Sequence, residues 1–142
     1  MSERVPVLAF QVRQRTYALT VTDVVEVAAM VEWLPLPDAP LGVLGLVNRH
    51  GEMLPLLDLR QLLYGQAAFV DDSTFFIVVE RDGQRLGVVV DAVDTVKYVP
   101  ADAFQPVPEN RYVRAVVQHE HAFLQVLNTS TLFACIAPRR EP

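Results

Sequence analysis

The chain has 142 residues, a net charge of −5 at pH 7 and a hydrophobic content of 51%. This length fits one domain, and an acidic chain without a clustered basic stripe is not expected to bind nucleic acid. No apolar stretch approaches the roughly 18 residues that span a bilayer, the N-terminus does not read as a signal peptide, and the single cysteine, Cys135, suits a reducing cytoplasm.

Short apolar runs separated by polar turns predict β-hairpins along the chain. The paired runs are Val7–Val12 with Tyr17–Val21, Phe75–Glu80 with Leu86–Val90, and Val113–Gln118 with Phe123–Leu127. Asp82 and Gly83, between the second pair, form a strong hairpin signal. Pro55 cannot donate a backbone hydrogen bond, so the strand Met53–Leu57 is expected at a sheet edge or a bulge.

Two short helices are expected after equivalent strands. Asp58 is a predicted N-cap, with Gln61 three residues on, for a helix from Leu59 to Leu63 that stops at Gly65. Asn128 or Thr129 is expected to cap a second helix that ends near Ile136. Residues 67–73 and 101–110 are expected to be loops, and the predicted fold class is all-β with minor helix.

An internal repeat supports two similar packing units. Shifted by 70 positions, Gly45–Leu63 aligns without gaps with Ala115–Phe133, and shifted by 69, Tyr17–Val27 aligns with Leu86–Val96. The repeat predicts one domain over residues 1–137, built from two intertwined lobes with halves of about 7–63 and 76–133, and a frayed tail at 138–142. Two small cores could not hide all the apolar side chains, so an exposed aliphatic surface for a partner is expected.

An ordered set of motifs carries a family resemblance: YALTVTDVVEV at Tyr17–Val27, Pro37-x-Ala39-Pro40, Gly45-x-Val47-Asn48, Gly51, Pro55-x-x-Asp58-Leu59-Arg60, and Gly87-Val88-Val89-Val90-Asp91-x-Val93. In this order they resemble the CheW family of bacterial chemosensory adaptors. The resemblance implies two SH3-like five-stranded β-barrel lobes, no enzymatic activity and no cofactor. It also implies a cytoplasmic adaptor, recruited to membrane-associated receptor arrays, that couples a chemoreceptor tip to the regulatory domain of a CheA-type histidine kinase.

Carried over from the family, the groove that receives the receptor would include Val24, Gly45, Asn48, His50, Gly51, Phe75 and Val96. His50 departs from the family pattern, which has arginine directly before the glycine. Arg49 is not expected to replace that arginine, because adjacent side chains of a strand or hairpin point to opposite faces. The departure leaves open a specialised adaptor of a non-flagellar pathway, such as twitching or surface sensing, with an altered receptor contact.

Other polar residues have structural interpretations. Asp58, Arg60, Asp82 and Gly83 are expected to serve caps, turns and local pairing, and the acidic loop residues Asp71, Asp72 and Glu109 to solvate turns rather than perform acid–base chemistry. Trp33 is expected to pack in the core or at an edge, with an exposed anchor as the alternative. His119 and His121 lie at a predicted hairpin tip and are expected to form an exposed turn. Their i, i+2 spacing leaves a small metal-binding β-barrel protein as the alternative, although no third ligand is evident.

Overall fold

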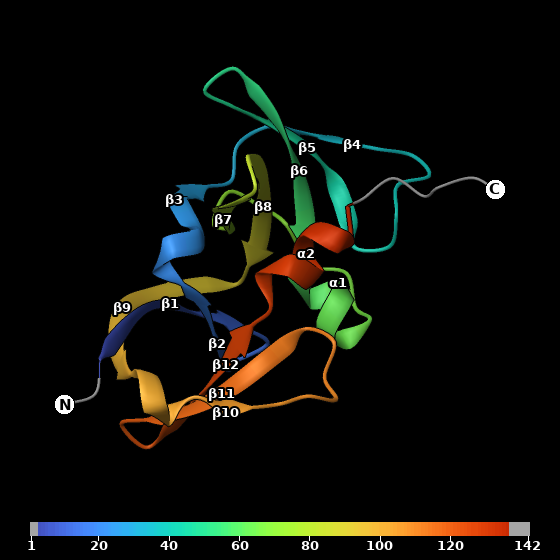
Figure 1. Cartoon of the computed structure of the whole chain (residues 1–142). Helices are drawn as coiled ribbons and strands as arrows, with labels where there is room; N and C mark the ends of the chain where they lie inside the picture. Colours follow the sequence, from blue (N-terminus) through green and yellow to red (C-terminus); the bar gives the residue numbers. More distant parts are fainter. Residues whose placement is uncertain (1–2, 137–142) are drawn as a thin grey trace.

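The computed structural model describes residues 3–136 of the chain, so residue 137 and the predicted tail at 138–142 lie outside it. Two six-stranded sheets lie one above the other, with both α-helices on one side between them (Figure 1). We call them the terminal sheet and the central sheet, and the unit built on each a lobe. In spatial order, the terminal sheet contains β10 (Gln105–Pro106), β11 (Val113–His119), β12 (Ala122–Leu127), β2 (Arg15–Thr20), β1 (Arg4–Val12) and β9 (Ala92–Pro100). The central sheet contains β3 (Val24–Ala29), β7 (Phe75–Arg81), β8 (Gln84–Val90), β6 (Glu52–Asp58), β5 (Val43–Arg49) and β4 (Trp33–Pro35).

The all-β fold with minor helix is confirmed, and each lobe has one strand more than the five implied by the resemblance. The additional strands are short: β4 pairs with β5 and β10 pairs with β11, each at the edge of its sheet. Residues 101–110, expected as a loop, contain β10 and a short 3-10 helix, η2 (Ala101–Ala103), while η1 (Val21–Asp23) precedes β3. Within residues 3–136, no helix is long and apolar enough to cross a membrane.

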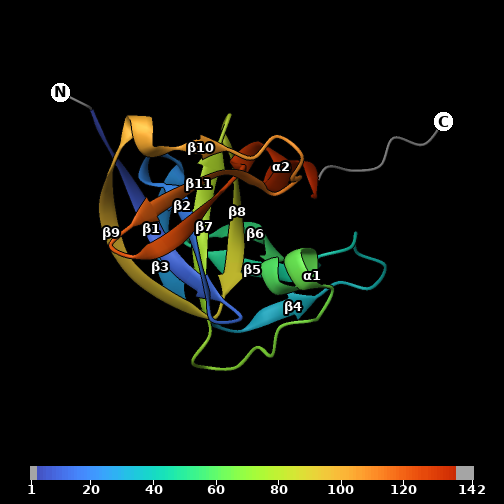
Figure 2. The same ribbon diagram turned by 90° about the horizontal axis from the view of Figure 1, so that it is seen from below.

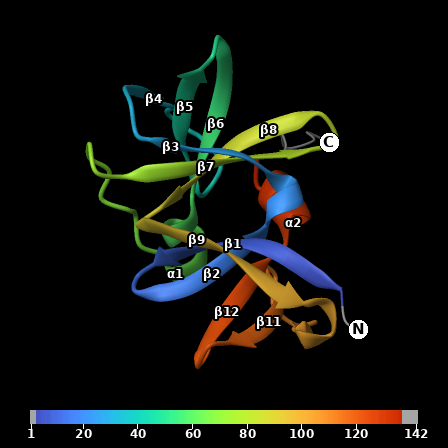
Figure 3. The ribbon, with the colours of Figure 1, turned by 90° about the vertical axis from the view of Figure 1, so that its left-hand side faces the viewer.

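The internal repeat appears in the structure as an exchange of strands between the lobes. Each of β1–β6 corresponds to the strand six places later, so that β1 corresponds to β7 and β2 to β8. With this correspondence the two sheets have the same order of strands. β12 pairs with β2 in parallel, and β6 pairs with β8 in the same way, so each lobe joins strands from both halves of the sequence. Figure 3 shows β3 crossing the molecule above β1 and β9.

Two-residue turns close the hairpins, and both residues of each turn have positive φ. These are Arg13–Gln14, His50–Gly51, Asp82–Gly83 and Glu120–His121. Such turns match the right-handed twist of the flanking strands. The predicted hairpins, including the turn at Asp82 and Gly83, are confirmed.

Pro55 lies in β6, an internal strand of the central sheet rather than an edge strand. The part of β6 around Pro55 is nevertheless paired on one side only, as at an edge. β6 pairs with β8 only over Leu56–Asp58, so the part of β6 that contains Pro55 has β5 as its one ladder partner. A proline is tolerated where a ladder hydrogen bond is not required.

The helices α1 (Leu59–Tyr64) and α2 (Thr129–Ala134) occupy matching positions in the repeat. Asp58 caps α1 by accepting a hydrogen bond from the Gln61 backbone N–H at 3.2 Å, and Gly65 ends the helix in the left-handed region. Asn128, rather than Thr129, caps α2. Seen from below, α1 and α2 lie at the same side of the strands (Figure 2).

Three apolar cores hold the lobes together, and the largest is shared between the two sheets. In β1, Val7 and Ala9 face the core of the terminal lobe, whereas Leu8 and Phe10 face the shared core. In β7, Phe76 faces the core of the central lobe and Ile77 faces the shared core. These strands are therefore buried on both faces, which explains their continuous apolar sequence.

Candidate partner-binding surfaces

The turn between β5 and β6 brings together three of the residues expected to contact a receptor. Asn48 is the last residue but one of β5, and its side-chain oxygen accepts a hydrogen bond from the Gly51 backbone N–H at 3.0 Å. His50 and Gly51 have φ values of 53° and 84°, and the side of Gly51 where a Cβ would stand is open. Asn48 thus fixes a turn whose tip presents an exposed imidazole and a bare backbone.

Glu26 of β3 reaches this turn and contacts both residues whose roles were in question. Arg49 Nε donates to Glu26 Oε1 at 2.5 Å, and His50 Nε2 lies 3.3 Å from Glu26 Oε2. The expectation that Arg49 and His50 point to opposite faces is wrong. Side chains alternate between the two faces only inside a strand, and His50 lies in the turn with positive φ. The side chains of Arg49 and His50 therefore both reach the Glu26 carboxylate.

This contact changes the electrostatics of Glu26. The hydrogen bond from Arg49 lowers the pKa of the Glu26 carboxyl, and the charges of Arg49 and His50 act in the same direction, against the opposing effect of burial. The carboxylate therefore stays ionised and anchors the β5–β6 turn to β3.

Two edge strands that occupy matching places in the repeat, β3 and β9, present exposed apolar side chains. Val25 and Val27 of β3 are exposed, as are Val96 and Tyr98 of β9. The 69-residue shift places Val27 on Val96. Both strands lie at the same side of the molecule (Figures 1 and 3). We call these four residues the edge-strand face.

The remaining groove candidates occupy different places. Phe75 begins β7, pairs with Ala29 of β3 and is partly exposed, while Val24 begins β3 and is half-buried against the shared core. Gly45 is buried: a Cβ there would lie 2.1 Å from the carbonyl oxygen of Leu34 in β4. Gly45 therefore permits the close approach of β4 and is covered by it.

Asp58 and Arg60 belong to the framework of the central lobe. The second Asp58 oxygen accepts a hydrogen bond from the Ala68 backbone N–H at 2.8 Å, so both oxygens are used within this chain. The Nε of Arg60 is buried and has no hydrogen-bond partner among the described residues, so the expected local pairing is not found at this atom.

The two histidines of the metal-site alternative do not share a strand. His119 ends β11, whereas His121 lies in the following turn with a φ of 68°, so the i, i+2 argument does not apply. His119 Nε2 lies 3.7 Å from a Glu120 carboxylate oxygen. Within residues 3–136, no group of three or more metal-ligating side chains is close enough to hold an ion.

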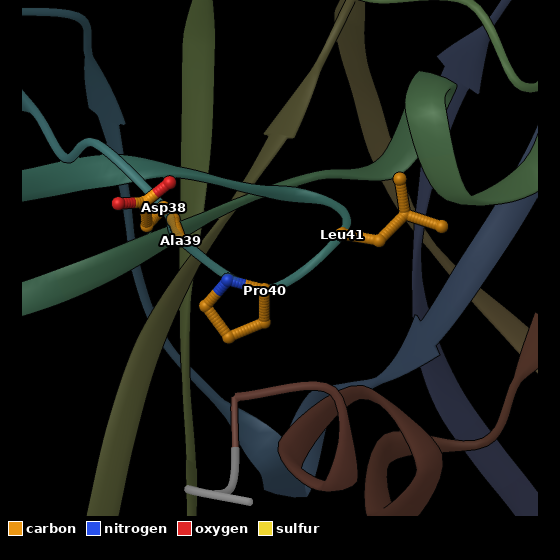
Figure 4. A pocket seen from close by; sticks show the side chains of 4 residues that line it. All are labelled: Asp38, Ala39, Pro40 and Leu41. Carbon is orange, nitrogen blue, oxygen red and sulfur yellow. The ribbon is translucent and has the colours of Figure 1, made fainter.

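One cavity lies beside the loop before β5. It measures about 480 Å³ and is lined by four consecutive residues of the loop before β5: Asp38, Ala39, Pro40 and Leu41 (Figure 4). Among the described residues that line it, Asp38 is the only titratable one, and the Leu41 side chain is exposed.

Comparison with known proteins decides the family. The sequence profile of the CheW-like domain matches residues 6–136. The chain belongs to the CheW family. Two relatives named as the chemotaxis protein CheW are those of Treponema pallidum, 23% identical over 93% of this chain and 84% of the relative, and Rhizobium meliloti, 27% identical over 89% and 85%.

The fold of this CheW-like chain is also that of a solved structure. The scaffolding protein TtCheW from Thermoanaerobacter tengcongensis superimposes with a TM-score of 0.79, at 24% identity over 90% of both chains. The resemblance drawn from the ordered motifs is therefore confirmed, and so are the two lobes it implied.

Glu26 is the residue that the reading of the CheW-like motifs missed. It stands between two exposed valines in an apolar strand, where a charge is costly unless it finds a partner. This isolated charge was the available signal, together with an arginine and a histidine side by side in a turn. Only the fold shows that β3 and the β5–β6 turn meet.

Proposed function

We propose that this CheW-family chain is a non-enzymatic adaptor that couples chemoreceptors to a CheA-type histidine kinase in a chemosensory array. The observation that carries the proposal is the edge-strand face, where the exposed Val27 and Val96 of the two lobes stand at repeat-matched positions, while Glu26 of β3 anchors the β5–β6 turn. A receptor helix that presents apolar residues at i, i+3, i+4 and i+7 can bury them against such a face. The relatives named as chemotaxis proteins support this reading.

The regulatory domain of the kinase is the second proposed partner, docked on one lobe. Adaptor function requires no cofactor and no catalytic residue, and it fits a cytoplasmic protein held at membrane-associated arrays by its partners. Interfaces of this kind are modest in area, so the individual affinities should be moderate, and array assembly would add avidity.

Substitution of the edge-strand face tests the receptor contact. We expect Val27→Asp and Val96→Asp each to weaken binding to a receptor cytoplasmic hairpin fragment by about tenfold or more, since each places a charge in an apolar contact. Phe123→Asp is the matched control, because Phe123 is an exposed apolar residue on β12, outside this face. Unchanged receptor binding in both valine variants, with the fold intact by circular dichroism, would contradict the proposed contact.

A second candidate function is a specialised adaptor of a non-flagellar pathway. It is favoured by His50, which stands at the sequence position of the family arginine. His50 and Arg49 both contact the Glu26 carboxylate. If the imidazole sets the partner, His50→Arg should strengthen binding to a receptor fragment of a flagellar pathway. If Arg49 has taken over the role of the family arginine, His50→Arg should leave binding unchanged and Arg49→Ala should weaken it.

A further inference from the structure

A cavity in the central lobe is lined by residues other than those of the edge-strand face and the β5–β6 turn. It measures about 440 Å³ and sits between the β3–β4 connection and the loop that precedes β7. We call it the Trp33 pocket, and its lining residues are Met30, Val31, Glu32, Trp33, Val70, Asp71 and Asp72.

Hydrogen bonds hold the walls of this pocket in place. The Met30 backbone N–H donates to the Thr74 carbonyl at 2.8 Å, which ties the two wall segments together. Asp71 Oδ1 accepts from the Ser73 N–H at 2.8 Å and from the Ser73 hydroxyl at 2.6 Å, and the Asp71 N–H donates to Thr74 Oγ1 at 3.0 Å. A site whose walls are already ordered loses less entropy when it binds.

The lining combines an indole and apolar side chains with three carboxylates. Met30 is buried, and Trp33 and Val70 pack against the core of the central lobe. The rim carries Glu32, Asp71 and Asp72. None of the ion pairs formed among residues 3–136 involves these three carboxylates. The hydrogen bonds from Ser73 lower the pKa of Asp71, so its carboxylate is charged at neutral pH.

Exposed apolar side chains from the same segments extend this surface. Val31 lines the pocket itself, and Phe69, which precedes the lining residue Val70, is also exposed. The surface therefore offers an apolar contact beside concentrated negative charge. Its complement is a cation with a flat apolar face next to aliphatic neighbours.

We propose that the Trp33 pocket binds an arginine side chain of a partner protein, presented beside aliphatic residues. A guanidinium is planar and stacks on an indole, and its fixed N–H donors match a carboxylate. An ammonium group would gain the charge attraction without the stacking or the paired donors. This proposal does not rest on the receptor contact or on the kinase contact.

Trp33 is the only tryptophan of the chain, so its fluorescence reports on this pocket directly. The probe is the tripeptide acetyl-Leu-Arg-Leu-amide, titrated into the full chain. The control peptide carries citrulline, which keeps the shape of arginine and removes its charge. We expect a saturable change in Trp33 emission at roughly millimolar arginine peptide and binding of the citrulline peptide weaker by about tenfold.

A double variant, Glu32→Gln with Asp72→Asn, tests the carboxylates. Asp71 is left unchanged because it holds the turn before β7. We expect the double variant to unfold at the same temperature as the wild type and to bind the arginine peptide about tenfold more weakly. Three results would overturn the proposal: an emission that does not change, equal binding of the two peptides, or undiminished binding by a folded double variant.

Discussion

At the scale of single residues, one carboxylate joins two elements that are far apart in the sequence. Glu26 belongs to β3, and its partners Arg49 and His50 belong to the turn after β5. The positive φ of His50 makes the convergence possible, because it turns the imidazole out of the alternation of the strand. Arg49, one position before the place of the family arginine, thus contacts Glu26 from the same turn as His50.

The Glu26–Arg49 contact should contribute stability that depends on pH. Because the pKa of Glu26 is lowered in the folded chain, this contribution is complete above the pKa of the unfolded chain, 4.5, and is lost as pH falls through the lower folded value. We expect Arg49→Ala to cost roughly 0.2–1 kcal/mol of unfolding free energy at pH 7 and less at pH 3. Urea denaturation at both pH values measures it.

Glu26→Gln supplies the control for this effect. In that background the amide cannot titrate, so the cost of Arg49→Ala should be the same at pH 7 and at pH 3. A cost in the wild-type background that does not change with pH would show that Arg49 contributes through packing rather than through the charge of Glu26.

Gly45 should tolerate no side chain. A Cβ at this position would lie 2.1 Å from the Leu34 carbonyl oxygen, and that backbone cannot move without separating β4 from β5. We expect Gly45→Ala to destabilise the fold by about 1–3 kcal/mol, the usual cost of overpacking. Gly51→Ala, where the space is open and only the positive φ opposes the substitution, should cost less in the same thermal denaturation experiment. Equal costs would contradict the role assigned to β4.

At the scale of elements, the two capped helices offer a comparison between the lobes. Asp58 caps α1 and also accepts from Ala68, whereas Asn128 caps α2 through one hydrogen bond to the Thr131 N–H at 3.3 Å. We expect Asp58→Ala to cost more than Asn128→Ala, for which a lost cap is worth about 1 kcal/mol. Chemical denaturation of both variants measures the difference, and a larger cost for Asn128→Ala would show that the Ala68 contact contributes little.

Elements with local signals could be predicted from the sequence, and those that depend on distant segments could not. The cap at Asp58, the stop at Gly65 and the turn at Asp82 and Gly83 rest on neighbouring residues. The exposed turn expected at His119–His121 is confirmed at Glu120 and His121, although this turn carries no glycine. The strands β4 and β10 are two or three residues long and form only because an existing edge accepts them.

The residues of the candidate receptor contact also fall into those that the sequence could place and those that it could not. Asn48, His50 and Gly51 are adjacent in sequence, and the structure keeps them in one turn. Gly45 belongs to the same motif but is covered by β4, and no local sequence pattern predicts that contact. The assignment of Val24, Asn48, His50, Gly51, Phe75 and Val96 to a receptor contact stays a prediction.

At the scale of the whole molecule, the exchange of strands makes each lobe depend on both halves of the sequence. β2 pairs with β12, and β8 pairs with β6, so a half-chain lacks the partners of its own strands. We expect the fragments 1–66 and 67–142 to be unfolded alone and to recover β-structure when mixed, as followed by circular dichroism. A fragment with a cooperative unfolding transition of its own would contradict this dependence.

The shared core buries apolar side chains of both sheets together. Leu8 and Phe10 of one sheet and Ile77 of the other bury together, which two isolated lobes could not achieve. What stays exposed includes the edge-strand face, which carries the proposed receptor contact.

A calorimetric titration with the regulatory domain of the CheA-type kinase from the same organism tests the adaptor function most directly. Adaptor function predicts saturable binding near one to one, with a micromolar dissociation constant, on the order of −8 kcal/mol. The Trp33 pocket and the edge-strand face could each fail its own test without changing this result. The absence of binding at high concentrations of both proteins would contradict the proposal that this CheW-family chain couples receptors to a kinase.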